Sequence, residues 1–151
     1  MAGWTNKGKL MLLSVAFDSE AVQTNYYIAL VTSAVAPTAD TNTFTELTEI
    51  ADTQGYTTGG KILAPGTDFD APTEDDTDDR GTIQIVDQVW TASGGTLPAS
   101  GDGARYAVLL DDNATVASRE VYAYWDLVSD RSVSDGQTLT LTDCELRLNE
   151  S

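Results

Sequence analysis

Residues 120–127 read EVYAYWDL, and their side chains alternate in character along the run. Because successive side chains of a strand point to opposite faces, this pattern predicts a β-strand with one face in a core. We expect the buried face to carry Val121, Ala123, Trp125 and Leu127, and the other face to carry Tyr122 and Tyr124. The two tyrosines are interpreted either as an exposed contact surface or as side chains covered by a neighbouring strand or loop.

The segments on both sides of this run carry similar signals. We expect strands in residues 25–32, 61–64, 82–90, 104–110 and 137–148. A shift of phase near Val86 predicts a bulge, with Ile83, Ile85 and Val89 on one face. In the last segment we expect these residues to face inward: Leu139, Leu141, Cys144, Leu146 and Leu148. Short strands separated by turns predict a mainly β protein, an antiparallel β-sandwich or jelly-roll-like fold.

Helical patterns are limited to the first third of the chain. Residues 6–17 repeat Leu10, Leu13 and Phe17 at helical spacing, and Asn6 is the predicted N-cap. One or two helical turns are expected in residues 44–50. We therefore divide the chain into an N-terminal arm with a helix, residues 1–24, and a single β-sandwich domain, residues 25–151, with an acidic loop at 66–81.

The stretch QGYTTGG, residues 54–60, is rich in glycine but lacks the Lys-Ser/Thr ending of a P-loop. We expect Gly55 to adopt a positive φ, Tyr56 to pack back on the domain, and Gly59 and Gly60 to reverse the chain. The sequence thus predicts a structural turn here rather than a binding loop.

Composition limits the functions available to the chain. It has 151 residues, 41% of them hydrophobic, which suffices for one globular domain. Eight basic and 24 acidic residues give a net charge of −16, which repels nucleic-acid phosphates and anionic membranes. No transmembrane segment is apparent in the sequence. We therefore expect neither a nucleic-acid partner nor a membrane partner.

Catalytic residue types are scarce. The chain has no histidine, the side chain that most often acts as a general base near neutral pH. Its single cysteine, Cys144, is expected to be a buried strand residue. Pairs of carboxylates could in principle hydrolyse glycosides, but no motif selects one pair. We expect a protein that is not an enzyme and that binds no cofactor.

Residues 68–79 (DFDAPTEDDTDD) contain seven acids in twelve positions. A run of this kind is usually a solvated loop, here one that could face a basic partner. The alternative is a calcium site with Asp76, Asp78 and Asp87 as ligands at EF-hand-like spacing. Arg80 occupies the position of one ligand in that scheme, so we expect no metal site, and the calcium site stays the alternative interpretation of these three residues.

Several short motifs occur in an order that resembles a family of small structural proteins of tailed bacteriophages. They are IALVTSA (28–34), GYTTGG (55–60), DQVW (87–90), RYAVLL (105–110), residues 126–136 ending in VSDG, and LRL (146–148). Family members share a KLALYTSAA strand, a GYTAGG turn, a D-x-x-W strand and a VSxG stretch that closes on LRL. The N-terminal helical region and the acidic insert at 68–79 depart from that pattern.

The resemblance implies a virion structural protein, assembled in the host cytoplasm. We expect a capsid decoration (cement) protein that binds the major capsid protein or other virion proteins and forms a dimer or trimer on the particle. The alternative is a tail or tail-fibre subunit that recognises the host surface. Fibre-type repeats are absent from the sequence, which favours the first.

The predicted partner interface comprises Trp4, Lys7, Lys9, Tyr122 and Tyr124. The N-terminal stretch MAGWTNKGK would serve as a docking arm, since it carries a tryptophan and two of the eight basic residues. The alternative is an N-terminal strand that covers the protein's own core.

Overall fold

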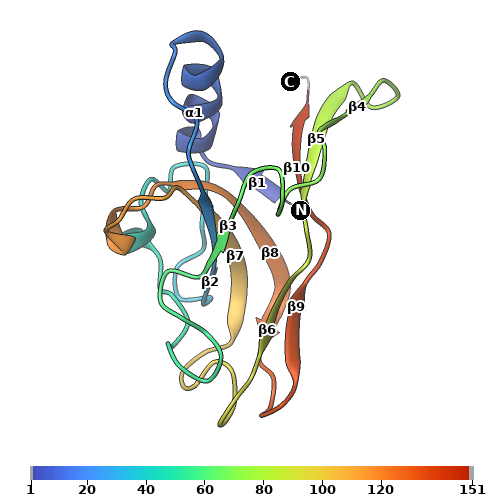
Figure 1. Cartoon of the computed structure of the whole chain (residues 1–151). Helices are drawn as coiled ribbons and strands as arrows, with labels where there is room; N and C mark the ends of the chain where they lie inside the picture. The colour runs from blue at the N-terminus through green and yellow to red at the C-terminus, as the bar shows by residue number, and fades with distance from the viewer. Residues whose placement is uncertain (1, 150–151) are drawn as a thin grey trace.

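The largest sheet has five antiparallel strands in the order β1-β8-β7-β2-β3 (Figure 1). We describe it from a computed structural model, in which residues 2–149 are placed. The strands are β1 (Ala2–Trp4), β8 (Val121–Arg131), β7 (Ala104–Leu110), β2 (Tyr26–Val31) and β3 (Lys61–Leu63). The protein is thus mainly β, with antiparallel sheets of five, three and two strands.

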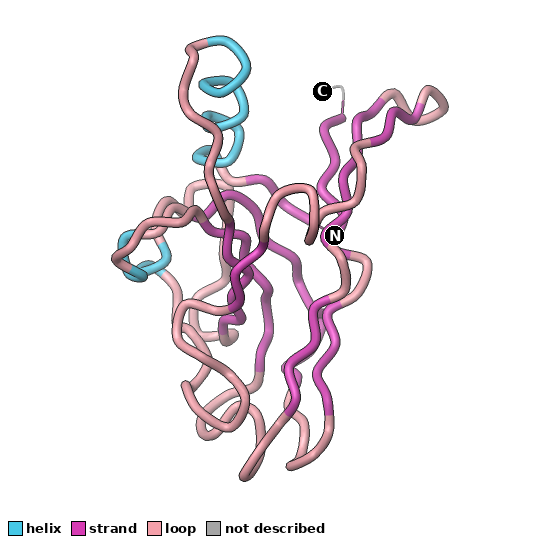
Figure 2. Tube along the Cα trace, viewed as in Figure 1, coloured by secondary structure: helices cyan, strands magenta, loops and turns pink. Residues whose placement is uncertain are grey.

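The two smaller sheets follow one another along a bent ribbon. In one, β5 (Arg80–Ile85) pairs with β10 (Cys144–Asn149) and with β4 (Thr73–Asp75). In the other, β6 (Gln88–Thr91) pairs with β9 (Thr138–Leu141). Two residues separate β5 from β6 and two separate β9 from β10. The tube view shows β6 and β9 running beside the five-stranded sheet and the β4–β5 hairpin rising beyond it (Figure 2).

Both faces of the five-stranded sheet are covered. The first core lies between the sheet and the ribbon, and includes Ile28, Leu30, Trp90, Trp125, Leu139 and Leu146. The second core lies on the opposite face and includes Ala29, Val31, Phe44, Val108, Leu110 and Val121. Strand β2 supplies residues alternately to the two cores, which explains its uninterrupted apolar sequence.

Helix α1 (Asn6–Phe17) confirms the predicted helix, but its cap is one residue earlier than predicted. The N-cap is Thr5, whose Oγ1 accepts a hydrogen bond of 3.0 Å from the amide of Gly8. The Thr5 hydroxyl also contacts the carbonyl oxygens of Val121 and Tyr122, so this cap fixes the helix to strand β8.

The predicted helical turns in residues 44–50 are confirmed only for the first turn. A short 3-10 helix, η1 (Phe44–Glu46), is present, but the chain then becomes extended. The amide of Thr32 donates to the carbonyl of Thr48, and the amide of Ile50 donates to the carbonyl of Leu30. Residues 48–50 therefore form hydrogen bonds to the end of β2 instead of continuing the helix. A second 3-10 helix, η2 (Val116–Ser118), was not predicted.

A bulge in β8 changes the predicted faces of that strand. Leu109 pairs with Ala123 and Leu110 pairs with Val121, which leaves Tyr122 as an extra residue. Val121 consequently joins the second core, whereas Ala123 and Trp125 join the first. The prediction that Val121 shares a face with the latter two is wrong for this reason.

Two apolar residues predicted to face inward are exposed. The predicted change of phase near Val86 is confirmed by the break between β5 and β6, but Trp90, not Val89, enters the core after it. Leu148 is exposed because this end of β10 pairs only with β5, beyond the five-stranded sheet. Leu139, Leu141, Cys144 and Leu146 are buried as predicted.

The acidic segment at 66–81 is mostly exposed, as predicted, but part of it is a strand rather than a loop. Strand β4 lies within it and forms a hairpin with β5. The guanidinium of Arg80 lies 2.9 Å from carboxylate oxygens of both Asp75 and Asp78, which neutralises part of the charge at the turn. The hairpin leaves most of its acids exposed.

Candidate functional site: an apolar cleft beside helix α1

The QGYTTGG stretch is a structural turn, as predicted. Gly55, Gly59 and Gly60 all have positive φ values, of 99°, 85° and 77°. A Cβ on Gly60 would lie 2.1 Å from the carbonyl oxygen of Ile28, so the turn packs directly on the β2 backbone. Tyr56 is buried in the first core.

A half-buried carboxylate holds this turn together. Glu49 Oε1 accepts hydrogen bonds from the hydroxyl of Tyr56, at 2.7 Å, and from the amide of Gly59, at 2.6 Å. Burial raises the pKa of the Glu49 carboxyl above its ordinary value, and these two hydrogen bonds partly offset that effect. Arg119 donates to the Gly59 carbonyl and stacks on the ring of Tyr27. These side chains are thus engaged in structural contacts, whereas the buried Oε1 of Gln54, at the start of the turn, has no hydrogen-bond partner among the described residues.

Helix α1 leaves most of its apolar side chains at least partly exposed. Of its twelve residues only Gly8 is buried, although the helix carries leucine, methionine, valine and phenylalanine side chains around its circumference. Leu10 and Leu13 are each 57% exposed, and Phe17 is 84% exposed. A helix that is apolar on all sides is normally buried in protein or lipid. The isolated chain therefore leaves uncovered a helix whose composition suits burial.

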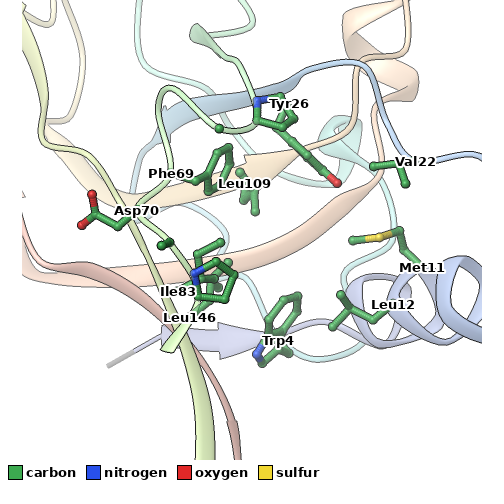
Figure 3. A pocket seen from close by; sticks show the side chains of 14 residues that line it. Trp4, Met11, Leu12, Val22, Tyr26, Phe69, Asp70, Ile83, Leu109 and Leu146 are labelled. Carbon is green, nitrogen blue, oxygen red and sulfur yellow. The ribbon is translucent and has the colours of Figure 1, made fainter. Parts of the chain in front are cut away.

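Beside this helix lies an apolar cleft with a volume of about 510 Å³. Met11 and Leu12 of α1 form one wall, and Figure 3 shows them facing Trp4, Ile83 and Leu146. The segment before β4 closes the remaining side, with Phe69, Asp70, Ala71 and Pro72 among its lining residues. Clefts of this size and apolar lining are typical of binding sites in proteins.

The walls of the cleft are held by specific contacts. The indole Nε1 of Trp4 donates to the carbonyl of Arg147, at 2.8 Å, which ties β1 to β10. The rings of Tyr26 and Phe69 meet edge to face, with centroids 5.6 Å apart. The cleft is therefore formed by packed aromatic side chains and belongs to the folded domain.

The charges around the cleft are unequally distributed. The first 17 residues contain two lysines and no acid, whereas the segment 68–79 opposite contains seven acids. Lys7 already pairs with Glu120, at 2.6 Å, while the exposed Lys9 has no ion pair among the described residues. Helix α1 is thus a basic, apolar element on a strongly acidic protein.

The structure separates the residues of the predicted interface. Trp4 lies in the cleft wall and packs against the first core, and Tyr122 is only 2% exposed. These positions agree with the alternatives of an N-terminal strand on its own core and of a covered tyrosine. Tyr124 is half-buried, and its ring lies against Gly3. Lys9 is exposed. A role of these residues in partner binding stays a prediction.

The three calcium candidates do not converge. Asp76 and Asp78 lie in the β4–β5 turn, and Asp87 follows the far end of β5, a strand that spans roughly 20 Å. No cluster of three potential metal ligands occurs within residues 2–149. The carboxylate of Asp78 instead pairs with Arg80.

Cys144 is a buried thiol in the first core, as predicted. Burial, together with the nearby carboxylates of Asp143 and Asp87, raises its pKa to about 12. The thiol is therefore protonated at neutral pH, and the sequence has no histidine to activate it.

The cleft itself was not predicted from the sequence. Its lining comes from segments far apart in the chain, so no local motif marks it. The available signal was the helix at 6–17, whose apolar residues exceed what one buried face needs.

No protein-family model, curated protein or solved structure matches this chain. Within residues 2–149, none of the helices has the length and apolar character needed to cross a membrane.

Proposed function

We propose that this protein is a structural component of a bacteriophage virion, specifically a decoration protein that binds across major capsid protein subunits and stabilises the head shell. The observation that carries the proposal is the uncovered apolar helix α1 on an otherwise well-packed acidic domain. A subunit of an assembly would bury such a helix against another protein.

Burying the exposed apolar side chains of this helix would release a substantial free energy. Fully burying a leucine or phenylalanine side chain stabilises by about 1.5–3 kcal/mol. Leu10, Leu13 and Phe17 retain more than half of their exposure, so covering them supplies a sizeable part of that energy at each site. Contacts of this kind between protein molecules, repeated over a lattice, stabilise a shell by mass action.

Charge and sequence support the same proposal. A net charge of −16 disfavours contact with packaged DNA, so the outer surface of a shell is the suitable location. The order of the IALVTSA, GYTTGG, DQVW and LRL motifs resembles phage structural proteins. We also assign the domain to the β-sandwich, jelly-roll-like class, because the five-stranded sheet packs one face on the β5–β6 and β9–β10 ribbon.

The test uses particles from a phage that encodes the chain, prepared with and without it. Shells without the protein should release DNA at lower temperature, and adding the purified protein should restore their resistance. Equal resistance of the two preparations would contradict the decoration role. Labelled antibody that marks the tail tip and leaves the head bare would instead support a tail or tail-fibre subunit.

A further inference from the structure

We propose that two copies of this chain pair reciprocally, with helix α1 of each copy seated in the cleft of the other. The inference deepens the proposed function, because it names the partner of helix α1. It rests on two features that one chain carries side by side, an exposed apolar ridge and an apolar groove.

The ridge and the groove use different residues of the same helix. Leu10, Leu13 and Phe17 lie three and four positions apart, so they share one face. None of them lines the cleft, whose helical wall is formed by Met11 and Leu12. One copy can therefore present its ridge outward while its cleft receives the ridge of the other copy.

The charges of the two surfaces complement each other. The ridge belongs to the segment 1–17, which has no acid and whose Lys9 is exposed, and the exposed Asp18 and Glu20 follow its C-terminal end. The cleft is bordered by Asp70 and continues into the β4–β5 hairpin, where Glu74 and Asp76 are exposed. Two molecules of charge −16 repel each other over most of their surface, so contact is favoured where a basic segment of one meets acids of the other.

The reciprocal arrangement also supplies more contact area. A stable interface buries about 800 Å² on each partner, which is about a tenth of the 7988 Å² exposed by this chain. A two-fold pair uses both helices and both clefts, so each molecule contributes its ridge and its groove. It closes on itself, whereas one-way insertion would continue into a filament.

Analytical ultracentrifugation of the full chain over a concentration series tests the pairing. We expect a reversible monomer–dimer equilibrium. On the ridge, Phe17→Asp should raise the dimer Kd by about 30-fold or more. On the cleft wall, Ala71→Trp should have a similar effect, because the larger side chain occupies the groove. Val128→Asp is the control, since Val128 is an exposed apolar residue of β8 outside both surfaces.

A mixture of the two interface variants tests reciprocity. The Phe17→Asp chain keeps an intact cleft, and the Ala71→Trp chain keeps an intact ridge. Mixing them restores one of the two contacts, so heterodimers should form at concentrations where each variant alone is monomeric. An unrelated interface, or one between two α1 helices alone, would give no such rescue.

Three results would overturn the inference: a wild-type chain that stays monomeric at all concentrations, a dimer that neither variant weakens, or a mixture without rescue. Unchanged far-ultraviolet circular dichroism and thermal unfolding of each variant establish that it is folded. The measurement contains no shells, so failure of pairing and failure of shell stabilisation are observed separately.

Discussion

The body of the molecule and its N-terminal helix differ in how far their apolar side chains are exposed. In the body, Trp90 is 2% exposed and packs against Tyr56, and the turn at residues 54–60 is held by two hydrogen bonds to the Glu49 carboxylate. In α1, Phe17 is 84% exposed with no comparable cover. The body buries most of its large apolar side chains within the single chain, whereas α1 leaves Leu10, Leu13 and Phe17 largely exposed. We therefore propose that helix α1 serves assembly rather than folding of the single chain.

The largest expected effect is a core truncation in the body. Trp90→Ala should lower the free energy of unfolding by about 3–5 kcal/mol, because it removes a large side chain from the first core. The matched change Phe17→Ala should stay within about 0.5 kcal/mol. Urea unfolding at a protein concentration low enough to keep the chain monomeric measures both. Equal losses from the two truncations would show that α1 is packed in the monomer.

A backbone substitution should rank second. Gly60→Ala combines a positive φ of 77° with a Cβ placed 2.1 Å from the Ile28 carbonyl oxygen, and should cost about 3 kcal/mol. Gly101 has a φ of 76° and open space around it. Gly101→Ala should therefore cost only about 1 kcal/mol, the conformational part alone. If the two variants unfold at the same urea concentration, the close approach of the turn to β2 is wrong.

A smaller effect is expected at the carboxylate of the turn. Glu49→Ala leaves the Gly59 amide without its acceptor and should cost about 1–2 kcal/mol, while Glu49→Gln retains an acceptor oxygen and should cost less. Because the pKa of Glu49 is raised, the native state binds the proton of the Glu49 carboxyl group more tightly than the unfolded state does. Ionisation of Glu49 therefore reduces stability as pH rises from its ordinary pKa of 4.5 through the folded value.

The pH dependence gives a separate measurement of the same group. The unfolding free energy of the wild type minus that of Glu49→Gln should fall as pH increases through that window and stay constant above it. A difference that rises with pH would indicate a lowered pKa and would contradict the burial of Glu49. Comparing the two proteins cancels the contribution of the remaining acids.

Sequence patterns predicted the body better than they predicted the site. Short runs of apolar residues bounded by polar or turn residues placed β2, β3 and β7, because those strands have local signals. The bulge at Tyr122 could not be read from the sequence, since it arises from the pairing of β8 with β7. Likewise, the extended chain at Ile50 depends on a hydrogen bond to Leu30. The cleft could not be predicted because it depends on the position of α1 relative to the segment before the β4–β5 hairpin, and only the fold defines that position.

Thiol labelling of the Ala16→Cys variant tests most directly whether α1 is an assembly surface. Ala16 is exposed on α1, and the buried Cys144 serves as an internal probe of the body. In the dilute monomer the introduced thiol should react rapidly while Cys144 stays unreactive until the protein unfolds. In the dimer, or on the particle, the introduced thiol should become protected. If it reacts at the same rate in the monomer and in the assembled state, α1 is not buried by assembly and the proposed role of the helix is wrong.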